Sequence, residues 1–382
     1  MERGAKKIQV LVVDDSALMR REIRKILEED PEIEVVGAAR NGEEGLSLCK
    51  ELQPDVVTMD INMPVMDGLT ALQCIMMESP RPVVMLSSLT QDGAITTYEA
   101  LELGAVDFVP KPGGTVSVKI SDEASMIIAT VKAAAKARVG GRRSSRNSSK
   151  KKKAAPRAEV ATPPKTVAAS DLPGILVFGQ STGGPNAILE VLPHLPADLG
   201  LPVFVIQHMP GTFTPSFAQR LGLNSSFPFR EIQNGDLLLP NHGYLAPGDI
   251  HSRLVSKPGA REQAMFQLSR YPTDTAHSPS VGVGMESCLE MFGDRIIAVM
   301  LTGMGDDGAD AMVKIKNAGG RTIAEDESTA IVFGMPKEAI RRGGAEFVLP
   351  VQQIAEKIIE LAAGLKGSLR VEKTTEKKKR FA

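Results

Sequence analysis

Apolar runs and amphipathic stretches alternate in a regular order through the first third of the chain. Short apolar runs predict buried strands at residues 8–13, 33–36, 56–59, 82–86 and 106–109. Amphipathic stretches after these runs predict helices, the first with Leu18, Ile23, Ile26 and Leu27 near helical spacing, and the others at residues 42–52, 68–77, 94–103 and 122–137. Five strand–helix units in series predict a parallel sheet with helices on both faces.

The second half of the chain shows the same alternation with stronger apolar runs. Strands are predicted at residues 175–178, 202–207 and 295–301, and a helix is predicted at 186–192. Glycine-rich or polar turns follow the strands. We therefore expect a second α/β domain, with a doubly wound parallel sheet, over residues 172–366.

The composition excludes several classes of protein. Hydrophobic residues make up 42% and charged residues 24% of 382 residues, which is typical of a folded globular protein. No apolar run approaches the roughly 18 residues that a membrane span needs, so we expect no membrane insertion. Three scattered cysteines indicate a reducing compartment, and we expect a cytoplasmic location. The absence of Trp and the scarcity of other aromatic residues argue against nucleic-acid binding.

The net charge of −1 conceals a strongly basic segment. Residues 139–170 contain nine basic side chains and a single acid, Glu159, among Ser, Ala and Pro. Such a segment buries too little apolar surface to offset its ordering entropy, so we interpret it as a flexible linker. A docking site for an acidic partner is the alternative. Residues 367–382 form a charged tail.

Polar side chains follow the predicted strands of the first domain. Asp14 and Asp15 follow the first strand, Asp60 the third, Ser87 and Ser88 the fourth, and Lys111 the fifth. Because the carboxyl ends of parallel strands meet at one edge, these groups are expected to converge. Clustered carboxylates need a cation, and oxygen ligands suit Mg²⁺. One carboxylate can then act as a nucleophile toward a phosphoryl group.

These residues, with the Val109-Pro110-Lys111-Pro112 turn, resemble the receiver domain of two-component response regulators over residues 8–125. The resemblance implies a flavodoxin-like (βα)₅ fold and phosphorylation on Asp60. It also implies Mg²⁺ bound by Asp14, Asp15, Asp60 and the carbonyl of Asn62. Ser87, Phe108 and Lys111 match the residues that respond to the phosphoryl group, and a histidine kinase is the implied phosphodonor.

A candidate nucleophile opens the second domain. Ser181 lies in the turn Gly179-Gln180-Ser181-Thr182-Gly183-Gly184 between a predicted strand and helix, the setting in which a G-x-S-x-G turn exposes a serine. No Lys follows the glycines, which disfavours a Walker-type phosphate loop. Among five histidines, only His208 ends a predicted strand. Asp306 and Asp307 follow another strand, and the pattern alone does not choose between these two acids.

The turn around Ser181, together with Gln207-His208-Met209-Pro210 and Leu301–Gly308, resembles the catalytic domain of chemotaxis protein-glutamate methylesterases. The resemblance implies a Rossmann-like fold in which Ser181 is the nucleophile, His208 the base and Asp307 the orienting acid. Met304 becomes a candidate oxyanion donor, and no cofactor is expected in this domain. Gln180 departs from the small residue that is usual in the family.

The resemblance further implies a function for the whole chain. The expected activities are hydrolysis of glutamate methyl esters on the cytoplasmic helices of chemoreceptors and deamidation of receptor glutamines. A histidine kinase of the chemotaxis array would activate the enzyme by phosphorylation, which gives adaptation in chemotaxis signalling. The alternative is a transcriptional or scaffold response regulator with a non-catalytic output domain.

Overall fold

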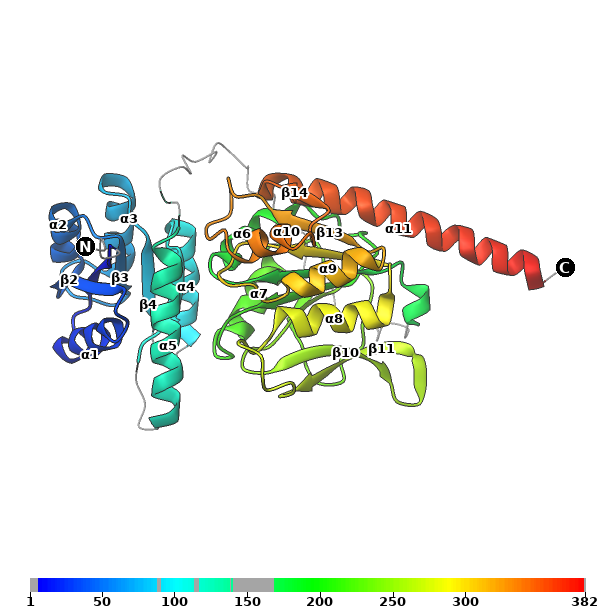
Figure 1. Ribbon diagram of the computed structural model, residues 1–382, viewed down its shortest axis with the longest axis horizontal. Helices are drawn as coiled ribbons and strands as arrows, with labels where there is room; N and C mark the ends of the chain where they lie inside the picture. Colours follow the sequence, from blue (N-terminus) through cyan, green and yellow to red (C-terminus); the bar gives the residue numbers. More distant parts are fainter. Residues whose placement is uncertain (1–5, 88–90, 113–116, 138, 140–167, 381–382) are drawn as a thin grey trace, which may run out of the picture.

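A computed structural model describes residues 6–87, 91–112, 117–137, 139 and 168–380 of the chain. It contains two α/β domains and a long C-terminal helix that projects from the second domain (Figure 1). Ser88 and most of the predicted linker, residues 140–167, lie outside the described residues.

The first domain is a five-stranded parallel sheet with the strand order β2-β1-β3-β4-β5. Its elements are β1 (Ile8–Val13), α1 (Ala17–Glu28), β2 (Ile33–Ala39), α2 (Gly42–Leu52), β3 (Val56–Asp60), α3 (Gly68–Glu78), β4 (Val83–Ser87), α4 (Gln91–Leu103), β5 (Asp107–Pro110) and α5 (Ser117–Ala134). The order is that of flavodoxin-like domains, as expected. The helix predicted at 122–137 instead begins at Ser117 and ends at Ala134, because an apolar pattern marks a helix's buried face more accurately than its ends.

The second domain is a seven-stranded sheet with the order β14-β13-β12-β6-β7-β9-β8, and every recorded strand pair in it is parallel. Its elements are β6 (Ile175–Gln180), α6 (Gly184–Val191), β7 (Val203–Gln207), α7 (Thr214–Leu223), β8 (Phe229–Glu231), β9 (Gly243–Leu245), β10 (His251–Lys257), β11 (Ala260–Ser269), α8 (Val281–Phe292), β12 (Ile296–Met300), α9 (Ala309–Asn317), β13 (Arg321–Glu325), α10 (Met335–Arg341), β14 (Phe347–Leu349) and α11 (Val351–Arg380), with short 3₁₀ turns at Ala169–Asp171 and Leu192–His194. The predicted doubly wound sheet is confirmed. The antiparallel pair β10–β11 is an addition that the sequence analysis did not predict.

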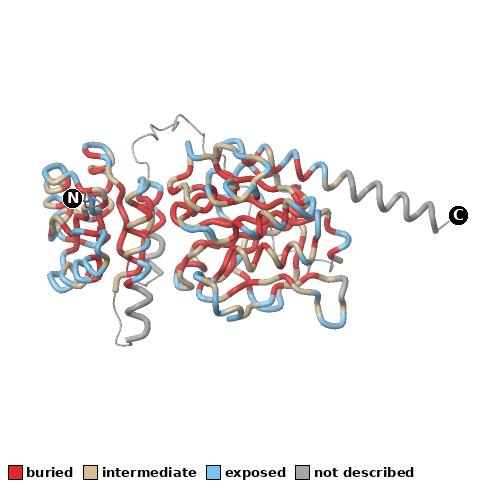
Figure 2. The backbone as a smooth tube through the Cα atoms, in the orientation of Figure 1, coloured by how far each residue is buried: buried red, intermediate tan, exposed pale blue. Residues whose placement is uncertain are grey.

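The apolar runs of the sequence form the buried central strands of the two sheets. Every residue of β3, β4, β6, β7 and β12 is buried, since helices cover both faces of each sheet (Figure 2). Side-chain caps fix several helix starts: Ser16, Asn41, Asp67 and Ser280 each accept a backbone N–H from the first turn. In α1 the residues Ile23, Ile26 and Leu27 are buried as the spacing predicts, but Leu18 is 61% exposed.

The order of the strands predicts a binding crevice in the second domain. From β6 the chain continues to β7 on one side, whereas β12 and β13 lie on the other side. Strand order therefore reverses between β6 and β12. Open α/β sheets bind ligands at such a reversal, beyond the carboxyl ends of the strands. The predicted catalytic residues follow β6, β7 and β12.

An aromatic cluster joins the two domains. Tyr98 of α4 stacks on Phe217 of α7, with ring centroids 5.7 Å apart. Phe108 of β5 packs on Phe213, with centroids 4.7 Å apart. The Tyr98 hydroxyl donates a hydrogen bond of 3.0 Å to the Phe213 carbonyl oxygen. Because both Phe213 and Phe217 are buried, this contact is a continuation of the hydrophobic core rather than a loose surface contact.

Candidate functional site

Ser181 and His208 each follow directly after one of two adjacent strands. Gln180 of β6 is in register with Gln207 of β7, and the His208 N–H donates a 3.1 Å hydrogen bond to the Gln180 carbonyl oxygen. Neighbouring parallel strands are about 4.8 Å apart, so the residues that follow them start from adjacent positions. The Gln207 side-chain amide also donates to the carbonyl oxygens of Ser181 and His208, at 3.0 and 2.9 Å, which ties the two turns together.

Asp307 reaches His208 from the third strand end. Its Oδ2 lies 2.8 Å from His208 Nε2. Asp306, the other acid of the same turn, is exposed and forms an ion pair with Arg342 on the surface. The geometry therefore distinguishes two neighbouring acids that the sequence pattern alone left equivalent.

The start of α8 holds the Asp307 carboxylate. The N–H groups of Val281 and Gly282 donate to it at 2.7 and 3.0 Å, and the Ser280 hydroxyl donates at 2.9 Å. Burial by itself raises the pKa of Asp307, but the hydrogen bond with His208, the charge of His208 and these N–H donors outweigh it and lower the pKa to about 2. Asp307 is thus an ionised, fixed partner for the imidazole at neutral pH.

The second ring nitrogen of His208 is buried and lacks a hydrogen-bond partner within the described part of the chain. The His208 side chain is 8% exposed. The imidazole of His277 covers it, stacked with ring centroids 4.0 Å apart and planes 23° apart. His277 remains exposed on its outer side. Partial desolvation where it packs on His208, together with the charge of His208, lowers the pKa of His277 to about 4. The sequence pattern does not indicate this position, since His277 lies in a polar loop remote from any strand end.

The turn after β12 packs directly on Ser181. The Ser181 N–H donates a 3.0 Å hydrogen bond to the Thr302 carbonyl oxygen. A Cβ added to Gly303 would lie 2.8 Å from the Ser181 Cβ, so only glycine allows this close approach. The next residue is Met304, and no protein acceptor for its N–H is recorded among the described residues.

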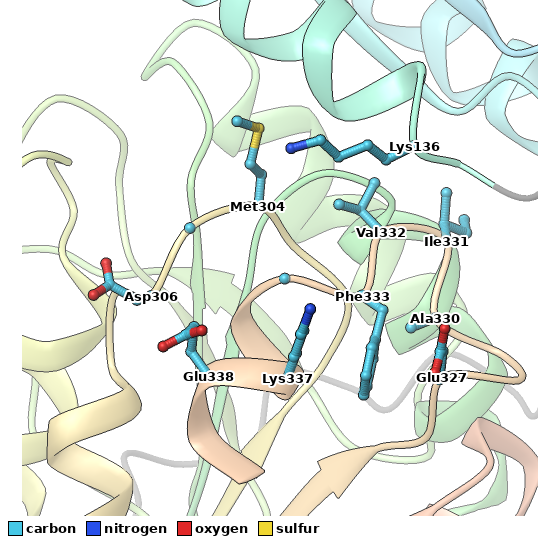
Figure 3. Close-up of a pocket in the computed structure, with 12 residues that line it drawn as sticks. Lys136, Met304, Asp306, Glu327, Ala330, Ile331, Val332, Phe333, Lys337 and Glu338 are labelled. Carbon is cyan, nitrogen blue, oxygen red and sulfur yellow. The ribbon is translucent and has the colours of Figure 1, made fainter. Parts of the chain in front are cut away.

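A cavity of about 680 Å³ opens on the other side of this turn. Met304 and Asp306 line it together with Lys337 and Glu338 of α10 (Figure 3). Lys136, which follows α5 of the first domain, extends over the cavity toward the Met304 side chain. The cavity lining combines apolar side chains with charges of both signs, and the first domain forms part of its wall.

Gln180, the departure from the usual small residue, is fully buried. A Cβ on Gly184 would lie 2.9 Å from its Cβ, so the side chain packs beneath the start of α6. No partner for either amide atom is recorded within the described residues. Gln180 therefore supports the turn from below and does not enter the crevice.

The predicted groups of the first domain also meet at one edge of their sheet. Carboxylate oxygens of Asp14, Asp15 and Asp60 all lie within 4.8 Å of one another. Lys111 Nζ lies 2.8 Å from an oxygen of Asp14 and 2.8 Å from an oxygen of Asp60. Burial raises the pKa of Asp60, and Asp14 adds to this, although Lys111 opposes it. An oxygen-only cluster of this kind fits a divalent cation such as Mg²⁺.

The predicted response residues surround this cluster. Ser87 is buried and its Oγ accepts a 2.8 Å hydrogen bond from Thr97 of α4. Phe108 is 6% exposed and contacts Phe213 of the second domain. Asn62, which was predicted to contribute a carbonyl, follows Asp60 by two residues.

Comparison with known proteins assigns both domains. Residues 10–119 match the response regulator receiver domain, and residues 176–358 match the CheB methylesterase family. Protein-glutamate methylesterase/protein-glutamine glutaminase 2 of Carboxydothermus hydrogenoformans is 51% identical over 93% of this chain and 99% of its own length. The protein-glutamate methylesterase/protein-glutamine glutaminase of Caldanaerobacter subterraneus is 48% identical over 93% of this chain and 96% of its own length.

The chain belongs to the protein-glutamate methylesterase/protein-glutamine glutaminase family. The predicted family and class of enzyme are thereby confirmed, and a non-catalytic output domain is disfavoured. A solved relative of the methylesterase domain, the Thermotoga maritima CheB catalytic domain, is 41% identical and covers 49% of this chain and 98% of its own, with a TM-score of 0.47.

Two features of this methylesterase were not found from its sequence. His277 comes into contact with His208 because of the path of its loop, which the sequence pattern did not predict. Glu325, by contrast, ends a strand next to β12, and its position at a strand end was a usable signal.

No helix among the described residues is both long and apolar enough to cross a bilayer.

Proposed function

We propose that this methylesterase hydrolyses glutamate γ-methyl esters on chemoreceptors with Ser181, His208 and Asp307, and deamidates receptor glutamines with the same residues. The observation that carries the proposal is the 2.8 Å contact between Asp307 and His208, at a strand end adjacent to Ser181. Three groups far apart in sequence are brought to one crevice, where a nucleophile, a base and an orienting acid are needed.

The contacts of His208 support the role that we propose for it. Nε2 is engaged by Asp307, so Nδ1 is the ring nitrogen left to take the Ser181 proton. Ser181 Oγ attacks the ester carbonyl carbon, and the proton passes to His208. Methanol leaves with that proton as the C–O bond breaks, and an acyl-enzyme remains. Water then attacks the acyl carbon and His208 again takes the proton. His208 returns this proton to Ser181 Oγ as the bond between Oγ and the acyl carbon breaks, which releases the glutamate.

The Met304 N–H is the proposed donor to the oxyanion. It lies in the turn that Gly303 holds against Ser181, and helix α6 begins three residues after the nucleophile. Both features place positive partial charge near the reacting carbonyl. A glutamine substrate passes through the same tetrahedral oxyanion. Its nitrogen leaves as ammonia after His208 protonates it.

The receiver domain is proposed to control access to this crevice. Asp60 would accept a phosphoryl group from a histidine kinase, with Asp14, Asp15 and the Asn62 carbonyl as further ligands for Mg²⁺. The ion would neutralise charge on the transferring group. Phe108 connects the phosphorylation site to the catalytic domain, because it packs on Phe213 in the loop that follows His208. A rearrangement of Phe108 would therefore weaken the packing that holds the two domains together.

We assign this activity to the cytoplasm and to adaptation in chemotaxis. The test is a time course of methanol release from methylated chemoreceptor membranes by the full-length chain, with and without acetyl phosphate and Mg²⁺. Ser181→Ala is expected to abolish release, and Asp60→Asn is expected to keep basal release but lose stimulation. Release by Ser181→Ala at the wild-type rate would exclude the proposed nucleophile.

A further inference from the structure

A buried carboxylate lies beneath the turn that follows β12, and it has no part in the mechanism described above. Glu325 ends β13 and is 1% exposed. Strand β13 pairs with β12, whose chain continues into the turn that carries Gly303 and Met304. Glu325 therefore lies at the same sheet edge as Ser181, His208 and Asp307.

Glu325 holds the backbone at the start of the turn. Its Oε2 accepts a 2.9 Å hydrogen bond from the Thr302 N–H, and this contact is buried. The carbonyl oxygen of Thr302 accepts the 3.0 Å hydrogen bond from the Ser181 N–H. One residue, Thr302, thus lies between the buried carboxylate and the nucleophile.

The Thr302 side chain extends the same network. Its hydroxyl lies 3.0 Å from the Thr182 carbonyl oxygen and accepts a 2.8 Å hydrogen bond from the Val332 N–H. The next N–H, that of Gly303, donates to the Val332 carbonyl oxygen at 3.1 Å. The turn after β12 is therefore fixed to the nucleophile turn on one side and to the segment before α10 on the other.

The other oxygen of Glu325 has a separate partner. Oε1 accepts a 3.0 Å hydrogen bond from the Thr329 hydroxyl, which in turn accepts from the Val351 N–H at 3.0 Å. This second contact leads away from the crevice, toward the start of α11. The two carboxylate oxygens of Glu325 thus accept hydrogen bonds from different partners, and the contribution of each contact can be tested separately.

We infer that Glu325 is a positioning residue for catalysis, which fixes the Thr302 peptide and so aims the Met304 N–H at the oxyanion. Oxyanion donors are effective only when they are already in place as the charge develops. No hydrogen bond from Glu325 to the side chain of Ser181, His208 or Asp307 is recorded among the described residues, and its contact with the turn is to the Thr302 backbone N–H, so it acts through the backbone. The inference rests on the proposed roles of Ser181 and Met304.

Three full-length variants test this role by methanol release from methylated receptor membranes, with acetyl phosphate and Mg²⁺ present. Glu325→Leu fills the space but removes the acceptor for Thr302. Glu325→Gln retains an acceptor oxygen. Thr329→Val leaves the Glu325–Thr302 contact in place and removes the contact that leads toward α11, and so serves as a matched control for destabilisation of the same cluster.

We expect Glu325→Leu to lower kcat about 10- to 100-fold at an unchanged KM, since loss of an oxyanion donor costs about 10²- to 10³-fold and a misplaced donor costs less. Glu325→Gln and Thr329→Val should stay within about 3-fold of the wild type, by the same argument. Thermal denaturation of each variant identifies a loss caused only by unfolding.

The outcomes separate the inference from the proposed function. If the wild type releases no methanol, the proposed function itself fails. If the wild type is active but Glu325→Leu and Thr329→Val lose the same activity, Glu325 is only structural. A change confined to KM, or a Glu325→Gln variant as slow as Glu325→Leu, would also overturn the inference. Slow labelling of Glu325→Leu by a fluorophosphonate, at wild-type thermal stability, would support it.

Discussion

The imidazole of His277 lies flat on that of His208, with ring centroids 4.0 Å apart. In the proposed mechanism His208 becomes positively charged when it takes the Ser181 proton, and a second positive charge in stacking contact would oppose that step. Partial desolvation against His208 and the charge of His208 lower the pKa of His277 to about 4, so His277 is neutral near pH 7. The stack thus shields His208 from water without adding a competing charge.

The low pKa of His277 predicts a loss of stability in mild acid. An unfolded histidine takes up its proton near pH 6.5, whereas folded His277 does so only near pH 4. The unfolded state therefore binds more protons between these values, and the free energy of unfolding falls as the pH decreases from about 6.5 to about 4. His277→Asn should reduce this fall.

Urea denaturation at several pH values between 7 and 4.5 measures the effect. His194→Asn, at an exposed position after α6, controls for the loss of a histidine as such. An identical pH dependence in the wild type and His277→Asn would contradict the prediction.

Asp307 and Asp306 offer a matched pair of substitutions. Asp307→Asn removes the charge next to His208, and we expect a loss in kcat of about 10²- to 10⁴-fold, on the scale known for such acids. Asp306→Asn disturbs only an exposed ion pair with Arg342 and should retain most of the activity. Methanol release under phosphorylating conditions compares the two variants. Equal losses would refute the assignment of the orienting acid.

Gly303→Ala tests the close contact between the turn and the nucleophile. The added Cβ would lie 2.4 Å from the Met335 sulfur and 2.8 Å from the Ser181 Cβ, so the turn must move away. We expect activity to fall by about 10²-fold, since a shift of about 1 Å has this effect on an aligned reaction. Gly364→Ala in α11 is the control, because its Cβ would meet nothing within 4 Å. Wild-type activity in Gly303→Ala would show that the turn tolerates displacement.

Much of the fold and of the site could be predicted from the sequence, for a physical reason. Buried parallel strands appear as continuous apolar runs, and polar residues directly after them must lie at one edge of the sheet. This reasoning located Ser181, His208 and the Asp14–Asp60–Lys111 cluster. It did not choose between Asp306 and Asp307, because the choice depends on which side chain turns toward α8. It also missed His277, whose position depends on the path of a long loop.

The last prediction concerns the contact between the two domains, in which Asp107 takes part. Asp107 begins β5 of the receiver and lies against the start of α6, where the Thr182 side chain and the Gly183 N–H are hydrogen-bond donors to it. Burial raises its pKa to about 7, and these donors, with the Phe108 N–H, only partly oppose the rise. When the domains separate, Asp107 becomes exposed and its pKa returns toward about 4.

The docked form therefore holds a proton more tightly than the separated form. Between pH 4 and pH 7 the separated carboxyl is ionised and the docked one is protonated, so docking weakens as the pH rises through this range and is constant above it. Energy transfer between dyes on the two domains should decrease from pH 5 to pH 7 in the wild type. Asp107→Asn, which cannot ionise, should keep its energy transfer over the same range. A wild-type signal independent of pH would mean that Asp107 remains ionised in the interface, held there by the dipole of α6 and the donors around it.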